Sequence, residues 1–480
     1  MRTNTFSNAV KNQKNPQGKT TTTNGAVAFK SSSDACVDLF YNIGSSRGKD
    51  IVPAFRAAYA QDKNVALRIA AWVRDVRGGA GERQVFRDIL SYLEKTDKKA
   101  AIALLNKVPE LGRWDDLFVV KTPELKREAY TLLGTALREK NGLAAKWTPR
   151  KGETAAEIRK FFGMSPKFYR KSLVELTNVV EQQMCAKDWD EINFSHVPSV
   201  AASRYKKAFY RNAKGKYKEY VAKLVKGDDP KVKVNASAIF PYDVLKGRIG
   251  SYARSMNATE LALIEKQWEA LPNYVGDAPV LPLVDVSGSM VCGVAGTNMS
   301  CLEVAVSLGL YLADKNKGKF KDTFLTFSSS PELMHLTGTI NQKIDEMVRS
   351  NWQMSTDLNK AMDKILDVAI KGNVSAAEMP SMLLILSDMQ FNECVNRSNT
   401  AFEMTARKFA NAGYEMPKVV FWNLNAVYGN APVKFNTNGT ALVSGFSPSI
   451  VKPLLAGDMD GFTPEGIMLK TVMADRYFVM

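Results

Sequence analysis

The chain has 480 residues, 45% of them hydrophobic and 10% aromatic, and a formal net charge of +16. This length exceeds what a single hydrophobic core organises, so we expect at least two domains. No apolar run reaches the roughly 20 residues that a helix needs to cross a bilayer, which argues against a membrane span. Five dispersed cysteines without a CxxC pair argue against a disulfide framework and against a zinc ribbon.

The N-terminal residues are rich in Asn, Thr and Lys and contain no apolar stretch. Residues 1–24 are therefore predicted to form a flexible tail rather than a secretory signal. Together with the scattered cysteines, this composition leads us to expect a reducing, cytoplasmic location.

Residues 25–275 repeat an amphipathic pattern, with apolar residues three and four positions apart, as in DIVPAFRAAYAQD and NVALRIAAWVRDVRG. Short breakers such as GGAGE separate these segments. Helices joined by short loops pack as neighbours, so a long run of them predicts a helical-repeat domain. The sequence shows no strict period, and this prediction depends on the helix pattern alone.

Residues 278–480 follow the linker GDAP and alternate between strands and helices. The expected strands are VLPLVDV, one or two within KDTFLTFSSSPELMHL, MLLILSDMQF, KVVFWNLNA and TALVSGFS. Continuous apolar strands separated by helices predict an α/β domain with a doubly wound, mostly parallel sheet covered on both faces. Such sheets bind ligands at the carboxyl ends of their strands.

Oxygen-bearing side chains follow two of these strands. Asp285, Ser287 and Ser289 end VLPLVDVSGS, and Asp388 ends MLLILSD. Thr356 lies in a loop that leads into a predicted helix. We expect all five at one edge of the sheet, where their oxygens suit Mg²⁺ or another hard divalent cation with several bound waters. An open coordination position would then accept an acidic group from a partner.

The same residue types also occur in ordinary turns, where Asp and Ser cap the following helix. The convergence of Thr356 and Asp388 on the edge that carries Asp285 favours the metal site. Over about residues 278 to 480 the pattern resembles the von Willebrand factor A domain with its metal-ion-dependent adhesion site (MIDAS). The resemblance implies these metal ligands: Asp285, Ser287, Ser289, Thr356 and Asp388.

The positive charge is concentrated in the first part of the chain. Residues 281–480 contain 17 Lys and Arg against 19 Asp and Glu, which leaves 48 basic and 30 acidic side chains in residues 1–280. Such asymmetry indicates a polyanionic partner contacted by one domain. The alternative is a basic surface that serves solubility; we favour nucleic acid.

Cations and aromatic residues alternate between residues 204 and 226. Cations neutralise phosphates and exposed rings stack on bases, as single-strand binding requires. In the alternative interpretation the rings (Tyr205, Phe209, Tyr210, Tyr217 and Tyr220) face the core while the lysines extend into water. We favour core packing for the rings and phosphate contact for the cations. With two cations from a second cluster at 150–171, the RNA-binding candidates are Arg204, Lys206, Lys207, Arg211, Lys214, Lys216, Lys218, Arg170 and Lys171.

Two segments, WVRDVRGGAGERQVFRDIL (72–90) and PELGRWDDLF (109–118), resemble the TROVE module. That module and a C-terminal von Willebrand factor A domain make up the Ro RNA-binding autoantigen and its relatives. Segments such as residues 181–212 are more similar to a less characterised TROVE-related family, and the resemblance runs over about residues 24 to 480. It implies a ribonucleoprotein in which a ring of HEAT-like helical pairs, closed by the A domain, holds RNA. A stretch at about 140 to 172 departs from the pattern.

These observations predict a non-catalytic RNA-binding protein. Its basic helical ring grips single-stranded or structured RNA, and its Mg²⁺-binding A domain contacts a partner. The alternative is a protein–protein interaction or assembly module, in which the metal binds an acidic residue of the partner and the helical part is a scaffold. An enzyme is the weakest interpretation, because the sequence shows no nucleophile–base pair, nuclease-like carboxylate cluster or cofactor loop.

Overall fold

The computed structural model describes most of the chain, namely residues 18–177, 179–236, 239–249, 253, 255–327, 330–349, 357–391, 401–427, 429–456 and 461–480. None of the helices in these ranges is long and apolar enough to cross a membrane.

The chain divides into two compact units. The sheet unit comprises residues 1–69, 240–255 and 273–476, and the helical unit comprises residues 70–239, 256–272 and 477–480.

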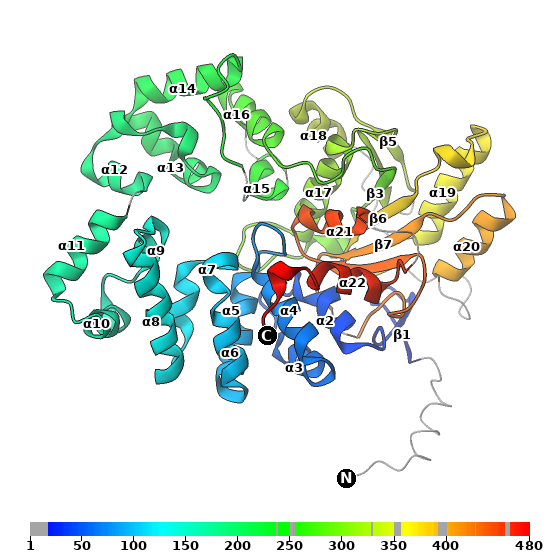
Figure 1. Ribbon diagram of the computed structural model, residues 1–480. Helices are drawn as coiled ribbons and strands as arrows, with labels where there is room; N and C mark the ends of the chain where they lie inside the picture. The colour runs from blue at the N-terminus through cyan, green and yellow to red at the C-terminus, as the bar shows by residue number, and fades with distance from the viewer. Residues whose placement is uncertain are drawn as a thin grey trace, which may run out of the picture. The chain divides into compact units, whose positions relative to one another are not determined.

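The sheet unit is built on six strands in the order β5-β4-β3-β6-β7-β8 (Figure 1). Neighbouring strands are parallel except for β4 and β5, which are antiparallel. The central strands β3 and β6 are buried at every residue, as their continuous apolar sequences predict. The strands are β3 Val280–Asp285, β4 Thr323–Phe327, β5 Leu333–His335, β6 Met382–Ser387, β7 Lys418–Asn423 and β8 Thr440–Ser444.

Two crossovers in this sheet run in opposite directions. Helix α17 connects β3 to β4, and α20 connects β6 to β7 on the other side of β3. Because such crossovers are right-handed, the two helices cover opposite faces. The predicted fold class, a helical part followed by a doubly wound, mostly parallel sheet, is thus confirmed. The helices of this unit are α2 Ala35–Ile43, α3 Val52–Gln61, α15 Pro241–Leu245, α17 Cys301–Lys315, α18 Ile340–Arg349, α19 Leu358–Lys371, α20 Ala401–Asn411, α21 Val451–Leu455 and α22 Pro464–Val472.

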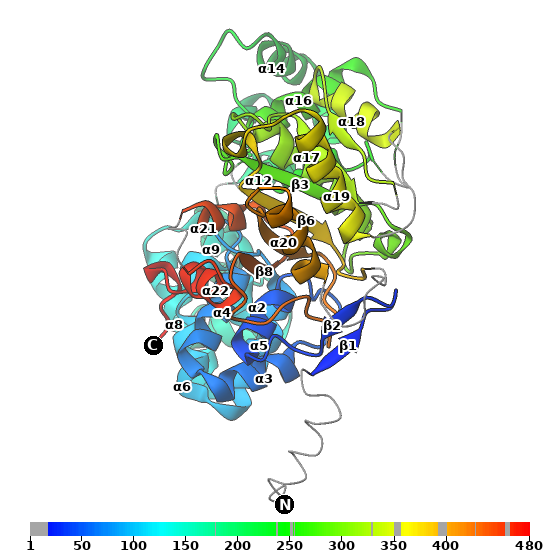
Figure 2. The same ribbon diagram turned by 90° about the vertical axis from the view of Figure 1, so that its right-hand side faces the viewer.

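The strand order reverses between β3 and β6, which are hydrogen-bonded neighbours (Figure 2). In an open α/β sheet, the carboxyl ends of the strands at such a reversal flank the crevice where ligands bind. The carboxyl ends of β3 and β6 are the places where Asp285 and Asp388 lie.

N-terminal residues also belong to the sheet unit. Strands β1 Lys19–Thr21 and β2 Val27–Phe29 form an antiparallel pair, and the hydroxyl of Thr22 donates a hydrogen bond to the carbonyl of Phe391. Part of the predicted tail, residues 1–24, is therefore ordered structure. Its first 17 residues lie outside the described ones.

Helix α2 packs against β8, although the sequence pattern assigned it to the helical domain. The hydroxyl of Ser444 donates to the carbonyl of Phe40 at 2.6 Å, and Nδ2 of Asn423 donates to the carbonyl of Tyr41 at 3.1 Å. The compact units thus divide the chain differently from the predicted boundaries. The difference arises from hydrogen bonds between residues about 400 positions apart in sequence, which no local sequence pattern predicts.

The helical unit is a succession of short helices, several of which contact the next helix in the sequence or the next but one (Figure 1). Their amphipathic patterns place the apolar stripe of each helix in the interior. Helix α4, Lys63–Arg74, begins in the sheet unit and ends here. The others are α5 Arg83–Thr96, α6 Lys98–Leu105, α7 Val108–Leu111, α8 Pro123–Arg138, α9 Gly142–Trp147, α10 Gly152–Phe161, α11 Pro166–Leu176, α12 Val180–Ala186, α13 Ser199–Asn212, α14 Lys214–Lys226 and α16 Ala258–Glu269.

A buried carboxylate links three segments of this unit. Asp116, 0% exposed, accepts hydrogen bonds at 2.7 Å from Nε of Arg74 and from Nε of Arg87. The backbone N–H of Arg113 is a third donor, at 2.9 Å. The charge of Asp116 is therefore fully compensated inside the protein.

Candidate functional site

Asp285 is the last residue of β3, and its side chain is completely buried. The backbone N–H of Ser287 donates to Oδ1 of Asp285 at 2.9 Å, and the hydroxyl of Ser387 donates to Oδ2. Both carboxylate oxygens are thus held in place by neighbours at the ends of β3 and β6.

Asp388 follows β6 and is 2% exposed. Its Oδ1 accepts from the backbone N–H of Gln390 at 3.2 Å, and the hydroxyl of Ser289 is a further donor to this carboxylate. The hydroxyl oxygens of Ser287 and Ser289 lie 3.1 Å apart. The structure therefore brings four of the five predicted metal ligands to one edge of the sheet.

Two buried carboxylates at one edge disfavour each other's charge. Burial, and then the charge of Asp388, raise the pKa of Asp285 to about 7. Burial also raises the pKa of Asp388, which the ammonium of Lys49 partly offsets. Within the described part of the chain, neither carboxylate forms an ion pair.

This donor set suits a hard divalent cation. It consists of carboxylate and hydroxyl oxygens, and the two carboxylates carry more negative charge than nearby side chains compensate. No group of three or more His, Cys, Asp or Glu residues among the described ones is placed to hold a metal. A cation at this edge would therefore depend on the serine hydroxyls and on water for most of its ligands.

Thr356, the fifth predicted ligand, lies outside the described residues. The described residue that follows it, Asp357, is the N-cap of α19, where its carboxylate accepts from the backbone N–H of Lys360 at 3.1 Å.

Sequence reasoning did not identify two side chains of this edge, Ser387 and Lys49. Ser387 had a local signal, because it directly precedes Asp388 at the end of an apolar strand. Lys49 had none, because it lies in the N-terminal segment, and only the fold brings its ammonium near Asp388.

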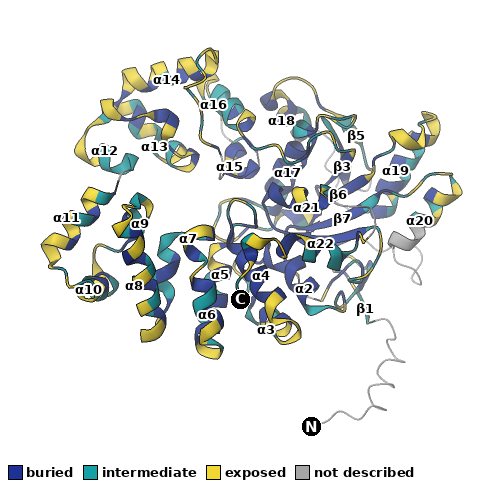
Figure 3. Cartoon of the chain, viewed as in Figure 1, coloured by how far each residue is buried: buried dark blue, intermediate teal, exposed yellow. Residues whose placement is uncertain are grey.

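The predicted RNA-binding cations lie on α11, α13 and α14 of the helical unit. All except Lys206 are exposed. Figure 3 shows exposed stretches on α11, α13 and α14. Arg204, Lys207 and Arg211 follow each other at spacings of three and four, so they share one face of α13. None of these three forms a hydrogen bond or ion pair with its side chain among the described residues.

Other predicted cations have partners inside the protein. Lys206 is partly buried and forms an ion pair of 2.9 Å with Glu260 of α16. Nζ of Lys216 donates to the carbonyl of Asp190. These two side chains are less available to a ligand than Lys207 or Arg211.

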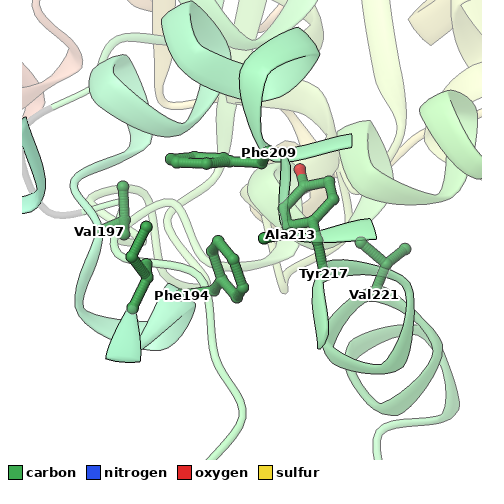
Figure 4. Packing of buried hydrophobic residues seen from close by; sticks show 7 residues of the cluster. Phe194, Val197, Phe209, Ala213, Tyr217 and Val221 are labelled. Atoms are coloured by element: carbon green, nitrogen blue, oxygen red, sulfur yellow. The ribbon is translucent and has the colours of Figure 1, made fainter. Parts of the chain in front are cut away.

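The aromatic residues of α13 and α14 form a hydrophobic cluster (Figure 4). The ring centroids of Phe194 and Phe209 lie 5.1 Å apart, and those of Phe194 and Tyr217 lie 4.9 Å apart, both pairs edge to face. Tyr205, Tyr210 and Tyr220 are partly buried against the same cluster. Core packing of the rings, which the sequence favoured, is confirmed.

Two families match the chain. One, described as a domain of unknown function (DUF2828), matches residues 22–113 and 136–279. The other, described as a domain of unknown function (DUF7788), matches residues 280–472.

Two individual proteins are similar over most of the chain. The crystal structure of the Deinococcus radiodurans RO (RSR) protein has a TM-score of 0.48 and 15% sequence identity, over 92% of this chain and 99% of that one. A similarity of this size does not show what the present chain binds. The uncharacterized protein L728 of Acanthamoeba polyphaga mimivirus is 32% identical over 511 residues, which cover 93% of this chain and 86% of that protein. The chain therefore belongs to the same protein family as the mimivirus protein L728.

Proposed function

We propose that the chain is a non-catalytic RNA-binding protein whose contacts lie on the exposed cations of α13, α14 and α11. The observation that carries this proposal is the row Arg204, Lys207 and Arg211, three exposed cations on one helix face whose side chains have no partner within the described residues. Exposed cations without a partner in the protein can neutralise the phosphates of a nucleic-acid backbone.

The burial of the neighbouring rings limits how RNA is bound. Phe209 and Tyr217 are 0% and 4% exposed, so they offer no face on which a base stacks. Binding on α13 and α14 then consists mainly of phosphate contacts, which position a nucleic acid but read no sequence. We expect similar affinity for RNAs of equal length and different sequence.

In the same proposal, the sheet unit holds Mg²⁺ or another divalent cation at Asp285, Ser287, Ser289 and Asp388. Such a cation would supply a binding position for an acidic group of a protein partner. The buried pair Asp285 and Asp388, without an ion pair among the described side chains, supports this part. The second candidate function, a protein-assembly module, uses this site without RNA.

The RNA proposal is tested with labelled oligouridylate and an RNA duplex at several salt concentrations. We expect affinity to fall steeply with salt. In the variant Arg204→Gln/Lys207→Gln/Arg211→Gln, the slope of log K against log salt should become less negative by about 2 to 3, because each lost cation removes one phosphate contact.

A charge-matched control carries three neutralised lysines of the sheet unit, Lys317→Gln, Lys364→Gln and Lys470→Gln. It should keep the slope of the original protein. RNA binding that is absent, or independent of salt, would refute the function. An unchanged slope in the α13 variant alongside salt-dependent binding would refute the assigned surface.

A further inference from the structure

Two cysteines of the sheet unit lie close together although nine positions separate them. Cys292 follows the short 3-10 helix Gly288–Val291, and Cys301 is the first residue of α17. Their sulfur atoms are 3.2 Å apart. A disulfide bond is about 2.05 Å long, so the two sulfurs need to approach by only about 1 Å to form one.

The backbone holds the two residues opposite each other. The N–H of Cys301 donates to the carbonyl of Cys292 at 2.9 Å, and the adjoining pair Gly293 and Ser300 forms an antiparallel bridge. The loop of residues 293–300 is thereby closed at its base in the reduced protein. Bond formation therefore requires a side-chain adjustment and no rearrangement of the chain.

The two thiols differ in accessibility. Cys292 is partly exposed, whereas Cys301 is buried. A reagent in solution thus reaches Cys292 first, and Cys301 lies behind it as the thiol that completes the reaction. This division into an attacking and a resolving thiol is what exchange with a small disulfide requires.

A chain of hydrogen bonds ends at the sulfur of Cys292. Nδ2 of Asn425 lies 3.4 Å from this sulfur as a donor, and Lys49 in turn donates to Oδ1 of Asn425.

We propose that Cys292 and Cys301 form a thiol–disulfide exchange site, which a small disulfide such as oxidised glutathione converts to an intramolecular disulfide. The thiolate of Cys292 attacks one sulfur of the small disulfide, forms a mixed disulfide and expels one small thiolate. Cys301 gives up its proton, attacks the sulfur of Cys292 and expels the second. One small disulfide is reduced to two thiols, and the cysteine pair loses two electrons and two protons.

A metal is the other ligand that paired thiols can take. It does not fit here, because no third His, Cys, Asp or Glu among the described residues completes a metal-binding group. The product disulfide would instead fix the loop 293–300, directly after the turn that bears Ser287 and Ser289. The proposal is independent of RNA binding and of any cation at that turn.

The test treats the full folded chain with oxidised glutathione and measures intact mass and linked peptides. We expect the loss of two hydrogens and a link between Cys292 and Cys301. Cys301→Ser should trap a glutathione adduct on Cys292, and Cys292→Ser should leave Cys301 unmodified.

Cys185→Ser is the matched control, since Cys185 is exposed and lies in the helical unit; it should form the same link at the same rate. Free thiols at both 292 and 301, while Cys185 carries glutathione, would overturn the proposal. A link from Cys292 to Cys394 would overturn the pairing. The melting temperatures of both serine variants report whether the fold is kept.

Discussion

Asp116 in the helical unit and Asp285 in the sheet unit are both completely buried carboxylates. Asp116 has two guanidinium partners at 2.7 Å, whereas Asp285 has hydrogen-bond donors but a second buried carboxylate, Asp388, for a neighbour. The charge of the first is compensated by the chain itself. The second lacks such compensation, and for this reason it is the candidate for an external cation.

Removal of the compensated charge should have the largest effect on stability. Asp116→Ala leaves Arg74, 4% exposed, with a buried charge and no carboxylate. We expect a loss of about 3–5 kcal/mol in the free energy of unfolding, measured by urea denaturation. The partly exposed Asp115→Ala should lose about 1 kcal/mol or less. Equal losses of stability in the two variants would contradict the structural role of the buried Asp116.

The uncompensated charge should show itself as a dependence of stability on pH. The measurement is made with a chelator that removes divalent cations. The pKa of Asp285 is raised from 3.8 to about 7 in the folded protein, so its favourable contribution to the free energy of unfolding is complete below about pH 4. That contribution, at most roughly 4 kcal/mol, is lost as the pH rises towards and through 7. Asp285→Asn should therefore flatten the pH profile of the melting temperature over this window. A profile parallel to that of the original protein would contradict this.

Added Mg²⁺ should offset the unfavourable free energy of the two buried carboxylates. At neutral to slightly alkaline pH, Mg²⁺ at 100 times its Kd should stabilise the protein by about 2.7 kcal/mol, seen as a rise in melting temperature. Asp285→Asn should abolish the rise. Asp367→Asn, an exposed carboxylate on α19, should keep it. A rise of equal size in Asp285→Asn would place the cation elsewhere.

The smallest effect concerns the exposed cations of α13. Neutralising Arg204, Lys207 and Arg211 removes no side-chain hydrogen bond or ion pair within the described residues, so each change should alter the free energy of unfolding by no more than about 0.5 kcal/mol. The same variants should weaken RNA binding. A loss of several kcal/mol in stability would show that these cations serve the fold rather than a ligand.

Local sequence patterns predicted much of the sheet unit. Apolar runs identified β3 and β6, and the residues that end them, Asp285 and Asp388, meet at one edge because parallel neighbours end together. Patterns of polar and apolar residues also predicted that Phe209 packs inside while Arg211 remains outside.

Other features depended on contacts that form only in the folded chain. Helix α2 reads as one more amphipathic helix, and no local pattern reveals that its carbonyls are paired with β7 and β8. The two sulfurs of Cys292 and Cys301 meet because a bridge between Gly293 and Ser300 brings their segments together. Lys49 reaches the carboxylate edge only through the packing of the N-terminal segment.

Sequence patterns were sufficient to predict the class of the fold, the uneven distribution of charge and the oxygen-bearing strand ends. These properties depend on side-chain periodicity and on residues close together in the chain. Tertiary structure alone decided which buried carboxylate is compensated, which cations are free and which thiols are paired. Charge compensation and sulfur contact depend on distances of a few ångströms between side chains, and only the folded chain fixes those distances.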